Sequence, residues 1–321
     1  MSSAPSPRLA DALAAGTVVL DGGLSNQLEA AGHDLGDALW SARLLAEAPE
    51  AVVEAHRRYF EAGADVAITA SYQATFEGFA RRGIGPERAA GLIASSVEAA
   101  RTAARRARAG GVARPLWVAA SAGPYGAMLA DGSEYRGRYG LTPAELERFH
   151  RPRLEVLAAA GPDVLALETV PDADEARALL RAVRGLGTPV WLSYTVDGAR
   201  TRAGQRLEEA FALAAEAEEV IAAGVNCCTP DDADAAVATA ARVTGKPVVV
   251  YPNSGETWDA TARAWHGRPA FTADRVERWR ALGARLIGGC CRVGPDTIEV
   301  IARTLAPAAP SPRRRGDPEA G

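Results

Sequence analysis

The chain has 321 residues, of which 48% are hydrophobic, and a formal net charge of −4. This balance excludes a strongly basic surface for nucleic acid or anionic membranes, and no apolar run approaches the roughly 20 residues of a membrane-spanning helix. Residues 1–7 lack the basic and apolar regions of a signal peptide, so we expect a soluble, cytoplasmic protein whose cysteines meet a reducing environment.

Both ends of the chain are predicted to be disordered. Residues 1–7 and the tail 306–321 are rich in proline, serine and charge, which favours disorder over a packed core. Residues 8–305 are long enough for one α/β barrel or for two smaller domains.

Short apolar runs alternate with longer helical patterns throughout residues 8–305. The predicted strands are 17–20, 66–69, 116–120, 164–167, 190–194, 222–226, 247–251 and 285–287. The predicted helices are 49–62, 86–109, 143–160, 173–186, 207–217, 231–243 and 272–282, with a further helical pattern that begins near Ile298. Eight such units predict a single (β/α)₈ TIM barrel. An open doubly wound sheet usually has fewer units, and for nucleotides a G-x-G-x-x-G turn that this chain lacks after its first strand.

Polar and sulfur-containing side chains follow the predicted strands at the point where each strand ends. In strand order they are Asp21, Ser71, Ser121, Glu168, Tyr194, Cys227, Asn253 and the pair Cys290 and Cys291. The carboxyl ends of the strands in a parallel barrel share one face, which carries the active site in barrel enzymes. We therefore expect one pocket at this face to hold these residues.

All four cysteines of the chain lie after the sixth and eighth predicted strands. Thiolates from Cys227, Cys290 and Cys291, without an evident fourth protein ligand, predict a zinc site with an open position, as in catalytic zinc centres. Adjacent cysteines can share a metal only where the strand breaks into a turn, and Gly288-Gly289 permits that turn. Two alternatives stay open: cysteines that only pack in the core, and a redox disulfide between Cys290 and Cys291.

An open zinc site built from three thiolates suits a thiol substrate, because the metal lowers the thiol pKa and keeps the sulfur nucleophilic. This predicts S-alkyl transfer, since hydrolytic zinc sites more often use histidine and carboxylate ligands. Schiff-base chemistry is disfavoured because the one lysine, Lys246, precedes the seventh strand at the opposite end of the barrel.

Two carboxylates at strand ends predict an amino-acid substrate. Asp21 and Glu168 could bind an ammonium group, and Gly22-Gly23 would let backbone N–H groups approach a carboxylate. As alternatives, Asp21 could cap the following helix and Glu168 could pair with an arginine.

Seven segments at these turns form a recognisable set: Asp21 to Leu24 (DGGL), Thr69 to Thr75 (TASYQAT), Ser121 to Ala127 (SAGPYGA), Asp131 to Tyr135 (DGSEY), Leu167 to Thr169 (LET), Gly224 to Cys227 (GVNC) and Gly288 to Cys291 (GGCC). Together they resemble the homocysteine S-methyltransferases, and more narrowly the branch that uses S-methylmethionine, over residues 17–305. The resemblance implies a (β/α)₈ barrel with one zinc ion per chain on Cys227, Cys290 and Cys291, and homocysteine sulfur as the fourth ligand. It also implies that Asp21 and Glu168 hold the homocysteine amino group.

The sequence departs from the family pattern at two places. Cys228 follows Cys227 where the family more often has threonine, and because Asn226 precedes Cys227 we assign Cys227 as the ligand and Cys228 to packing. Ser25-Asn26-Gln27 stands where relatives often have a Thr-Glu pair, so the details of that pocket wall are not carried over.

The expected function is methyl transfer from S-methylmethionine, or from S-adenosylmethionine, to L-homocysteine, which gives methionine. The predicted substrate-binding residues are Asp21, Gly22, Gly23, Ser71, Tyr72, Tyr125, Glu168 and Asn226. A sulfonium donor is cationic, and aromatic rings that could attract it are those of Tyr72, Tyr125, Tyr135 and Trp258. The expected partners are small molecules, with no nucleic acid and no membrane.

Alternatives within the same fold are another donor, such as betaine or a methylated cobalamin module, and another thiol or selenol acceptor. A zinc or thiol-redox sensor on a barrel scaffold is the alternative from a different class. Neither the preferred donor nor the oligomeric state can be read from the sequence.

Overall fold

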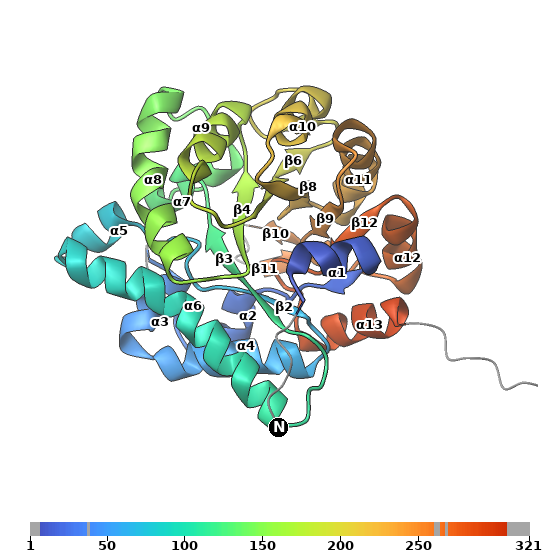
Figure 1. The fold of residues 1–321 in the computed structure, drawn as a ribbon, viewed down its shortest axis with the longest axis horizontal. Coiled ribbons are helices and arrows are strands. Elements are labelled where there is room, and N and C mark those ends of the chain that lie inside the picture. The colour runs from blue at the N-terminus through green and yellow to red at the C-terminus, as the bar shows by residue number, and fades with distance from the viewer. Residues whose placement is uncertain (1–6, 37–38, 260–263, 267–268, 307–321) are drawn as a thin grey trace, which may run out of the picture.

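The computed structural model of the chain describes residues 7–36, 39–259, 264–266 and 269–306 (Figure 1). The predicted disorder of residues 1–7 and 306–321 therefore falls outside the described residues, except at Pro7 and Ala306.

Eight parallel strands form the barrel. They are β1 (Val18–Val19), β2 (Val66–Ile68), β3 (Trp117–Ala122), β4 (Val164–Val170), β5 (Val190–Tyr194), β8 (Val220–Asn226), β9 (Val248–Tyr251) and β12 (Ala284–Ile287). Their order in the sheet is β1-β12-β9-β8-β5-β4-β3-β2, and a parallel bridge between Leu20 and Val66 closes the ring between β1 and β2. The predicted TIM barrel is confirmed, with each strand at its predicted place.

A ring of helices surrounds the strands (Figure 1). It comprises α4 (Pro49–Glu61), α6 (Pro86–Ala109), α8 (Pro143–Ala159), α9 (Ala173–Val183), α10 (Leu207–Glu216), α11 (Pro230–Thr244), α12 (Ala273–Ala281) and α13 (Pro295–Leu305). Five of these helices begin with proline, which has no N–H to leave unpaired in the first turn. In the described part of the chain, no helix is both long and apolar enough to cross a bilayer.

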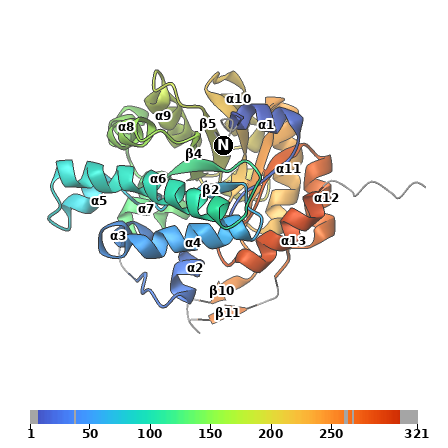
Figure 2. The same cartoon turned by 60° about the horizontal axis from the view of Figure 1, so that its bottom comes forward.

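Shorter elements complete the two ends of the barrel. They are α1 (Leu9–Ala15), α2 (Leu24–Ala30), α3 (Ser41–Glu47), α5 (Phe76–Ala80), α7 (Tyr125–Leu129), the 3₁₀ turn η1 (Ser133–Tyr135) and the hairpins β6–β7 (Val196–Asp197, Arg200–Thr201) and β10–β11 (Thr257–Asp259, Ala264–His266). Figure 2 shows α1 at one end of the barrel, and α2 and the β10–β11 hairpin at the other. These shorter elements were not predicted from the sequence.

The strands are largely apolar because both of their faces are buried, and polar residues such as Glu168 and Thr169 of β4 lie near their carboxyl ends. In β4, Val164 and Ala166 face the barrel interior, whereas Leu165 and Leu167 pack toward the helices. Leu9 and Leu13 of α1 join the interior cluster.

A buried histidine makes the stability of this fold sensitive to acid. His56 of α4 is fully buried, and neither ring nitrogen has a hydrogen-bond partner among the described residues. Burial lowers the pKa of His56 from 6.5 to about 4. Between these two pH values the unfolded chain binds more protons than the native one, so the free energy of unfolding falls as the pH falls through this window.

We expect His56→Leu to reduce the loss of stability on going from pH 7.5 to pH 5 by about 2 kcal/mol, because the variant removes this proton uptake. Urea unfolding of both proteins at both pH values measures the difference. His33→Leu, a change outside the core, is the control and should keep the wild-type pH dependence. An equal loss in wild type and His56→Leu would show that the native ring accepts a proton without penalty.

Candidate active site

A cavity of about 320 Å³ opens at the carboxyl ends of the strands. Residues that line it include Gly22, Gly23, Trp40, Tyr72, Gln73, Glu134, Tyr135, Glu168, Thr169, Cys227, Tyr251, Cys290 and Cys291. They come from segments at or after seven of the eight barrel strands, so the barrel gathers residues far apart in sequence. As far as the structure describes it, the lining contains no arginine, lysine or histidine.

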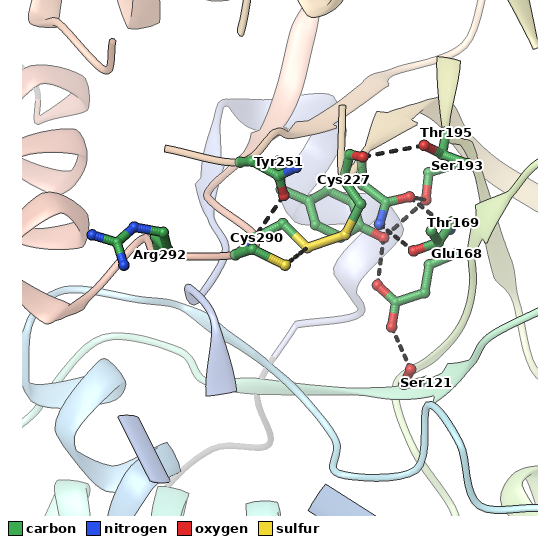
Figure 3. The surroundings of a disulfide bond; sticks show 12 residues. Ser121, Glu168, Thr169, Ser193, Thr195, Cys227, Tyr251, Cys290 and Arg292 are labelled. Atoms are coloured by element: carbon green, nitrogen blue, oxygen red, sulfur yellow. Dashed lines mark hydrogen bonds between the residues drawn. A yellow bond between two sulfur atoms is a disulfide. The ribbon is translucent and has the colours of Figure 1, made fainter. Parts of the chain in front are cut away.

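The three predicted metal ligands all line this cavity. Figure 3 shows Cys227 and Cys290 side by side. Cys227 follows β8 with a left-handed φ of 47°, and Cys290 and Cys291 follow β12. The structure joins Cys227 to Cys290 by a disulfide bond, and the Sγ atoms of Cys290 and Cys291 are 4.0 Å apart. The alternative of a disulfide between Cys290 and Cys291 is therefore wrong, because the bonded partner of Cys290 comes from another strand.

The geometry of the cysteines fits a metal ion once the disulfide is reduced. The three Sγ atoms all lie within 4.8 Å of one another. Tetrahedral zinc with Zn–S bonds of about 2.3 Å separates its sulfur ligands by about 3.8 Å, close to the distance between Cys290 and Cys291. No fourth cysteine and no histidine lines the described part of the cavity, which leaves one coordination position to a substrate.

Cys228 lies apart from these three cysteines. Its side chain is fully buried in the apolar cluster between strands and helices, where burial raises its pKa far above the ordinary value. This environment agrees with its assignment to packing.

The turn before the two cysteines requires glycine for lack of space. A Cβ atom on Gly289 would lie 2.1 Å from Cγ1 of Val293, and one on Gly288 would lie 2.7 Å from the backbone oxygen of Asp21. Neither glycine has a positive φ. The sequence predicts that Gly288 and Gly289 provide conformational freedom. The structure instead requires them because neighbouring chain segments approach too closely to leave room for a Cβ atom.

Glu168 is held at the end of β4 by two hydroxyl groups and is 6% exposed. Ser121 Oγ donates to its Oε1, and Tyr251 Oη donates to its Oε2 at 2.9 Å. Burial raises the pKa of Glu168 from 4.5 to about 7, although both hydrogen bonds act in the opposite direction. No arginine pairs with it in the described structure, so the alternative of an ion pair with arginine receives no support.

Asp21 is a second buried carboxylate, 1% exposed. Its Oδ2 accepts a hydrogen bond from the Ile68 N–H at 2.9 Å, whereas its Oδ1 has no partner among the described residues. Burial raises the pKa of Asp21 well above its ordinary value, and the nearby Glu168 adds to the rise. The side chain does not cap α2, whose N-cap is Gly23. Two buried carboxyls that interact with each other, and that have no positive partner among the residues described here, form a site for a cation.

Asn226 positions the backbone next to Glu168 and does not line the cavity. Its Oδ1 accepts hydrogen bonds from Thr169 N at 2.7 Å and from Ser193 Oγ at 2.8 Å, and its Nδ2 donates to Thr169 Oγ1 at 2.7 Å. Thr169 has a left-handed φ of 55°, a conformation that needs such support. We therefore interpret Asn226 as a positioning residue, where the sequence predicted a substrate contact.

Of the other predicted substrate-binding residues, some line the cavity and some do not. Gly22, Gly23 and Tyr72 line the cavity. Ser71 is fully buried beneath it, and its Oγ donates to the backbone oxygen of Ser121 at 2.7 Å. Tyr125 lines a different surface hollow.

Tyr125 is held in that second hollow by two aromatic neighbours. Its ring centroid lies 5.3 Å from that of Tyr139 and 4.8 Å from that of Phe149. This packing argues against the predicted contact of Tyr125 with substrate. Of the other aromatic candidates, Tyr135 lines the cavity, and the side chain of Trp258 falls outside the described part of the structure.

Several residues that line the cavity were not predicted as site residues from the sequence. Tyr251 ends β9 and was read as part of an apolar strand, although its hydroxyl group reaches Glu168. Gln73 and Glu134 lie inside the TASYQAT and DGSEY segments, which were used only to support the family resemblance.

Comparison with known proteins gives the family of this barrel. A profile of the family described as homocysteine S-methyltransferase matches residues 18–305. The chain belongs to this family. Homocysteine S-methyltransferase 4 of Zea mays is 46% identical to it, across 92% of this chain and 91% of the relative. The crystal structure of the metallated form of the homocysteine methyltransferase MmuM from Escherichia coli has a TM-score of 0.82 and 42% identity, covering 90% of this chain and 96% of that one. The crystal structure of the oxidized form of MmuM has a TM-score of 0.81 and 42% identity, and the match covers 89% of this chain and 95% of that one.

Membership of the homocysteine S-methyltransferase family confirms the resemblance found in the strand-end motifs. The protein is a methyltransferase that acts on small molecules, with homocysteine as methyl acceptor and methionine as product. Its Cys227, Cys290 and Cys291 form a cluster that could bind a metal.

Proposed function

We propose that the protein transfers a methyl group from S-methylmethionine to L-homocysteine, using one zinc ion per chain bound by Cys227, Cys290 and Cys291, and that residues 8–305 form the one domain that does so. The observation that carries the proposal is that three cysteine sulfurs and the buried Glu168 line one cavity, with no positive side chain in its described lining. The second buried carboxylate, that of Asp21, directly precedes the lining residues Gly22 and Gly23 and interacts with Glu168. A thiol that carries an ammonium group complements both features.

The acceptor half of the site binds and orients homocysteine. Bound zinc would supply the positive charge that lowers the pKa of the homocysteine thiol and keeps its sulfur nucleophilic. Glu168 and Asp21 accept hydrogen bonds from the ammonium group, whose charge compensates carboxylates that burial otherwise makes hard to ionise. Ser121 and Tyr251 fix the Glu168 carboxylate, so its position does not depend on substrate.

The transfer step needs no methylated enzyme. The homocysteine sulfur attacks a methyl carbon of the sulfonium, one carbon–sulfur bond forms as the other breaks, and the electron pair of the broken bond stays on the donor sulfur. Each turnover therefore gives two methionine molecules, and the homocysteine thiol proton leaves to solvent. Tyr72 and Tyr135 line the cavity, and their rings attract a sulfonium by about 0.5–2 kcal/mol.

Two features support S-methylmethionine over the other donors. The cavity is at the small end of the range for ligand pockets, about 300–1,000 Å³, and so suits two amino acids better than a nucleoside donor. Its acidic lining suits a donor with a net positive charge better than betaine, whose charges cancel.

The reaction products distinguish the donors. Reduced, zinc-loaded protein is offered homocysteine with S-methylmethionine, S-adenosylmethionine or betaine, and methionine is quantified. We expect the highest kcat/KM with S-methylmethionine and two methionines for each homocysteine consumed, whereas the other donors give one. Because both substrates must be in line before transfer, initial-rate plots should intersect. Parallel plots, or a methyl label that stays on the protein when homocysteine is left out, would contradict direct transfer.

A further inference from the structure

Two polar residues of the cavity wall, Gln73 and Glu134, have buried oxygen atoms without a partner. Gln73 follows β2 and is 8% exposed, and its Oε1 accepts no hydrogen bond from the described residues. Glu134 belongs to η1, and its Oε2 is likewise buried and unpartnered within the described structure. Buried acceptors without a donor are rare because their desolvation is not compensated by a hydrogen bond. Their presence in a cavity wall indicates a donor that arrives with a ligand.

Helix α7 holds both residues in place. Nε2 of Gln73 donates to the backbone oxygen of Ala127 at 2.9 Å, so the amide presents its oxygen, and not its N–H groups, as the unpartnered atom. Gly126 lies against the backbone of Glu134, since a Cβ atom there would be 2.4 Å from the Glu134 nitrogen. One short helix thus fixes two acceptors that line the same cavity.

The Glu134 carboxylate forms no ion pair among the described residues. The basic side chain that acts on Glu134 is that of Arg136, whose Nη2 lies 3.9 Å from Asp131 Oδ2. Burial raises the pKa of Glu134, and the neighbouring Asp131 adds to the rise. On the cavity side, Glu134 acts on the phenols of Tyr72 and Tyr135, whose pKa values are raised first by burial and then by charges that include this carboxylate. Glu134 and the two tyrosines that suit the methyl donor, Tyr72 and Tyr135, line the same cavity.

The number of carboxylates exceeds what the acceptor substrate needs. Homocysteine brings one ammonium group, for which Asp21 and Glu168 provide two buried carboxyls. Glu134 is a third. S-Methylmethionine brings two further positive groups, a sulfonium without N–H donors and an ammonium with three. The amide oxygen of Gln73 and the carboxylate oxygen of Glu134 can only accept hydrogen bonds. The ammonium group has N–H donors for them, whereas the sulfonium has none.

We propose that Gln73 and Glu134 bind the α-ammonium group of the methyl donor, which makes the enzyme selective for amino-acid sulfonium compounds. This inference rests on the proposed methyl transfer and names the part of the donor that is recognised. It assigns the two ammonium groups to different walls: Asp21 and Glu168 take that of homocysteine, and Gln73 and Glu134 take that of the donor. Sulfonium compounds without an amino group should then bind poorly.

The decisive experiment measures donor binding without turnover. Zinc-loaded, reduced protein is titrated calorimetrically with S-methylmethionine and with 3-(dimethylsulfonio)propionate, which keeps the sulfonium and the carboxylate but has no amino group. In Glu134→Gln, the Kd of S-methylmethionine should rise roughly 10- to 150-fold through loss of a charged hydrogen bond. The Kd of the compound without an amino group and the Kd of homocysteine should stay within about twofold of wild type.

Two further variants test whether the effect of Glu134→Gln comes from direct contact with the donor, and not from a general change in charge or from misfolding. Glu29→Gln removes the same charge from an exposed position of α2 whose carboxylate acts on Cys291 but does not line the cavity, and it should bind both sulfonium compounds as wild type does. Gln73→Met removes the amide acceptor from the same site and should weaken S-methylmethionine several-fold with zinc retained.

Three results would overturn the inference: wild-type affinity for S-methylmethionine in Glu134→Gln, equal weakening of both sulfonium compounds, or weakening of homocysteine instead. Failure of the wild-type protein to bind S-methylmethionine would overturn it as well. If binding depends on Glu134 but no methionine forms, the inference stands and the proposed function fails.

Discussion

Cys227→Ser, Cys290→Ser and Cys291→Ser proteins are expected to lose zinc and to form no methionine. Each variant leaves two of the three sulfur ligands that lie within 4.8 Å of one another, and a serine hydroxyl remains protonated where a thiolate is needed. Elemental analysis after dialysis should give about one zinc per chain in reduced wild type and almost none in the variants. Full zinc occupancy in all three variants would refute the assignment.

Two controls accompany this measurement. Cys228→Ser should keep both zinc and activity, apart from a modest loss of stability, because Cys228 lies in the apolar core. If this variant alone lost zinc, the ligand after β8 would be Cys228. Wild-type protein with the Cys227–Cys290 disulfide intact should bind little zinc until a reductant is added, since a disulfide sulfur is not a thiolate.

The barrel could be predicted from the sequence because its strands are buried on both faces. Runs such as β9 and the first four residues of β4 are apolar and alternate with helices long enough to show their period, so their type and order are readable. The elements that shape the cavity are different. Helix α7 has five residues and η1 has three, too few for any periodicity to appear in the sequence.

The site could be predicted where a side chain directly follows a strand. Asp21 and Glu168 were found in this way because the strand fixes the position of its last residues. Position alone does not give the direction of a side chain, since alternate residues of a strand point to opposite faces. Asn226, the last residue of β8, therefore turns toward Thr169. Ser71 lies three residues beyond β2, where the strand no longer fixes its direction, and it hydrogen-bonds beneath the cavity.

Residues farther from a strand end were not predictable from the sequence. Gln73 and Glu134 reach the cavity only because α7 holds their segments together across more than 50 residues of sequence. The signal that could have found them is chemical: they are polar side chains inside two segments that carry the family resemblance, TASYQAT and DGSEY. Tyr125 shares such a segment and points elsewhere, so the signal identifies candidates and does not assign roles.

Glu168→Gln is expected to lower kcat/KM for homocysteine by roughly 10- to 150-fold, because it removes the charge that pairs with the substrate ammonium. The amide keeps the shape of the carboxylate and an acceptor for Ser121 or Tyr251, so zinc should stay bound. In wild type, kcat/KM should fall as the pH drops below about 7, where the buried Glu168 takes up a proton. That part of the pH dependence should be absent from Glu168→Gln. An unchanged kcat/KM would remove Glu168 from the substrate site.

The same substitution should stabilise the substrate-free protein. Because the folded pKa of Glu168 is raised from 4.5 to about 7, the native state binds more protons than the unfolded chain between these values, and its stability falls as the pH rises through them. Above about pH 7, Glu168→Gln avoids this cost and should gain up to about 3 kcal/mol in the free energy of unfolding. Below pH 4.5 the two proteins should differ little. Homocysteine should raise the melting temperature of zinc-loaded wild type more than that of the variant, since only the carboxylate gains a counterion. A variant that is both less active and less stable at pH 8 would indicate that Glu168 serves the fold rather than the substrate.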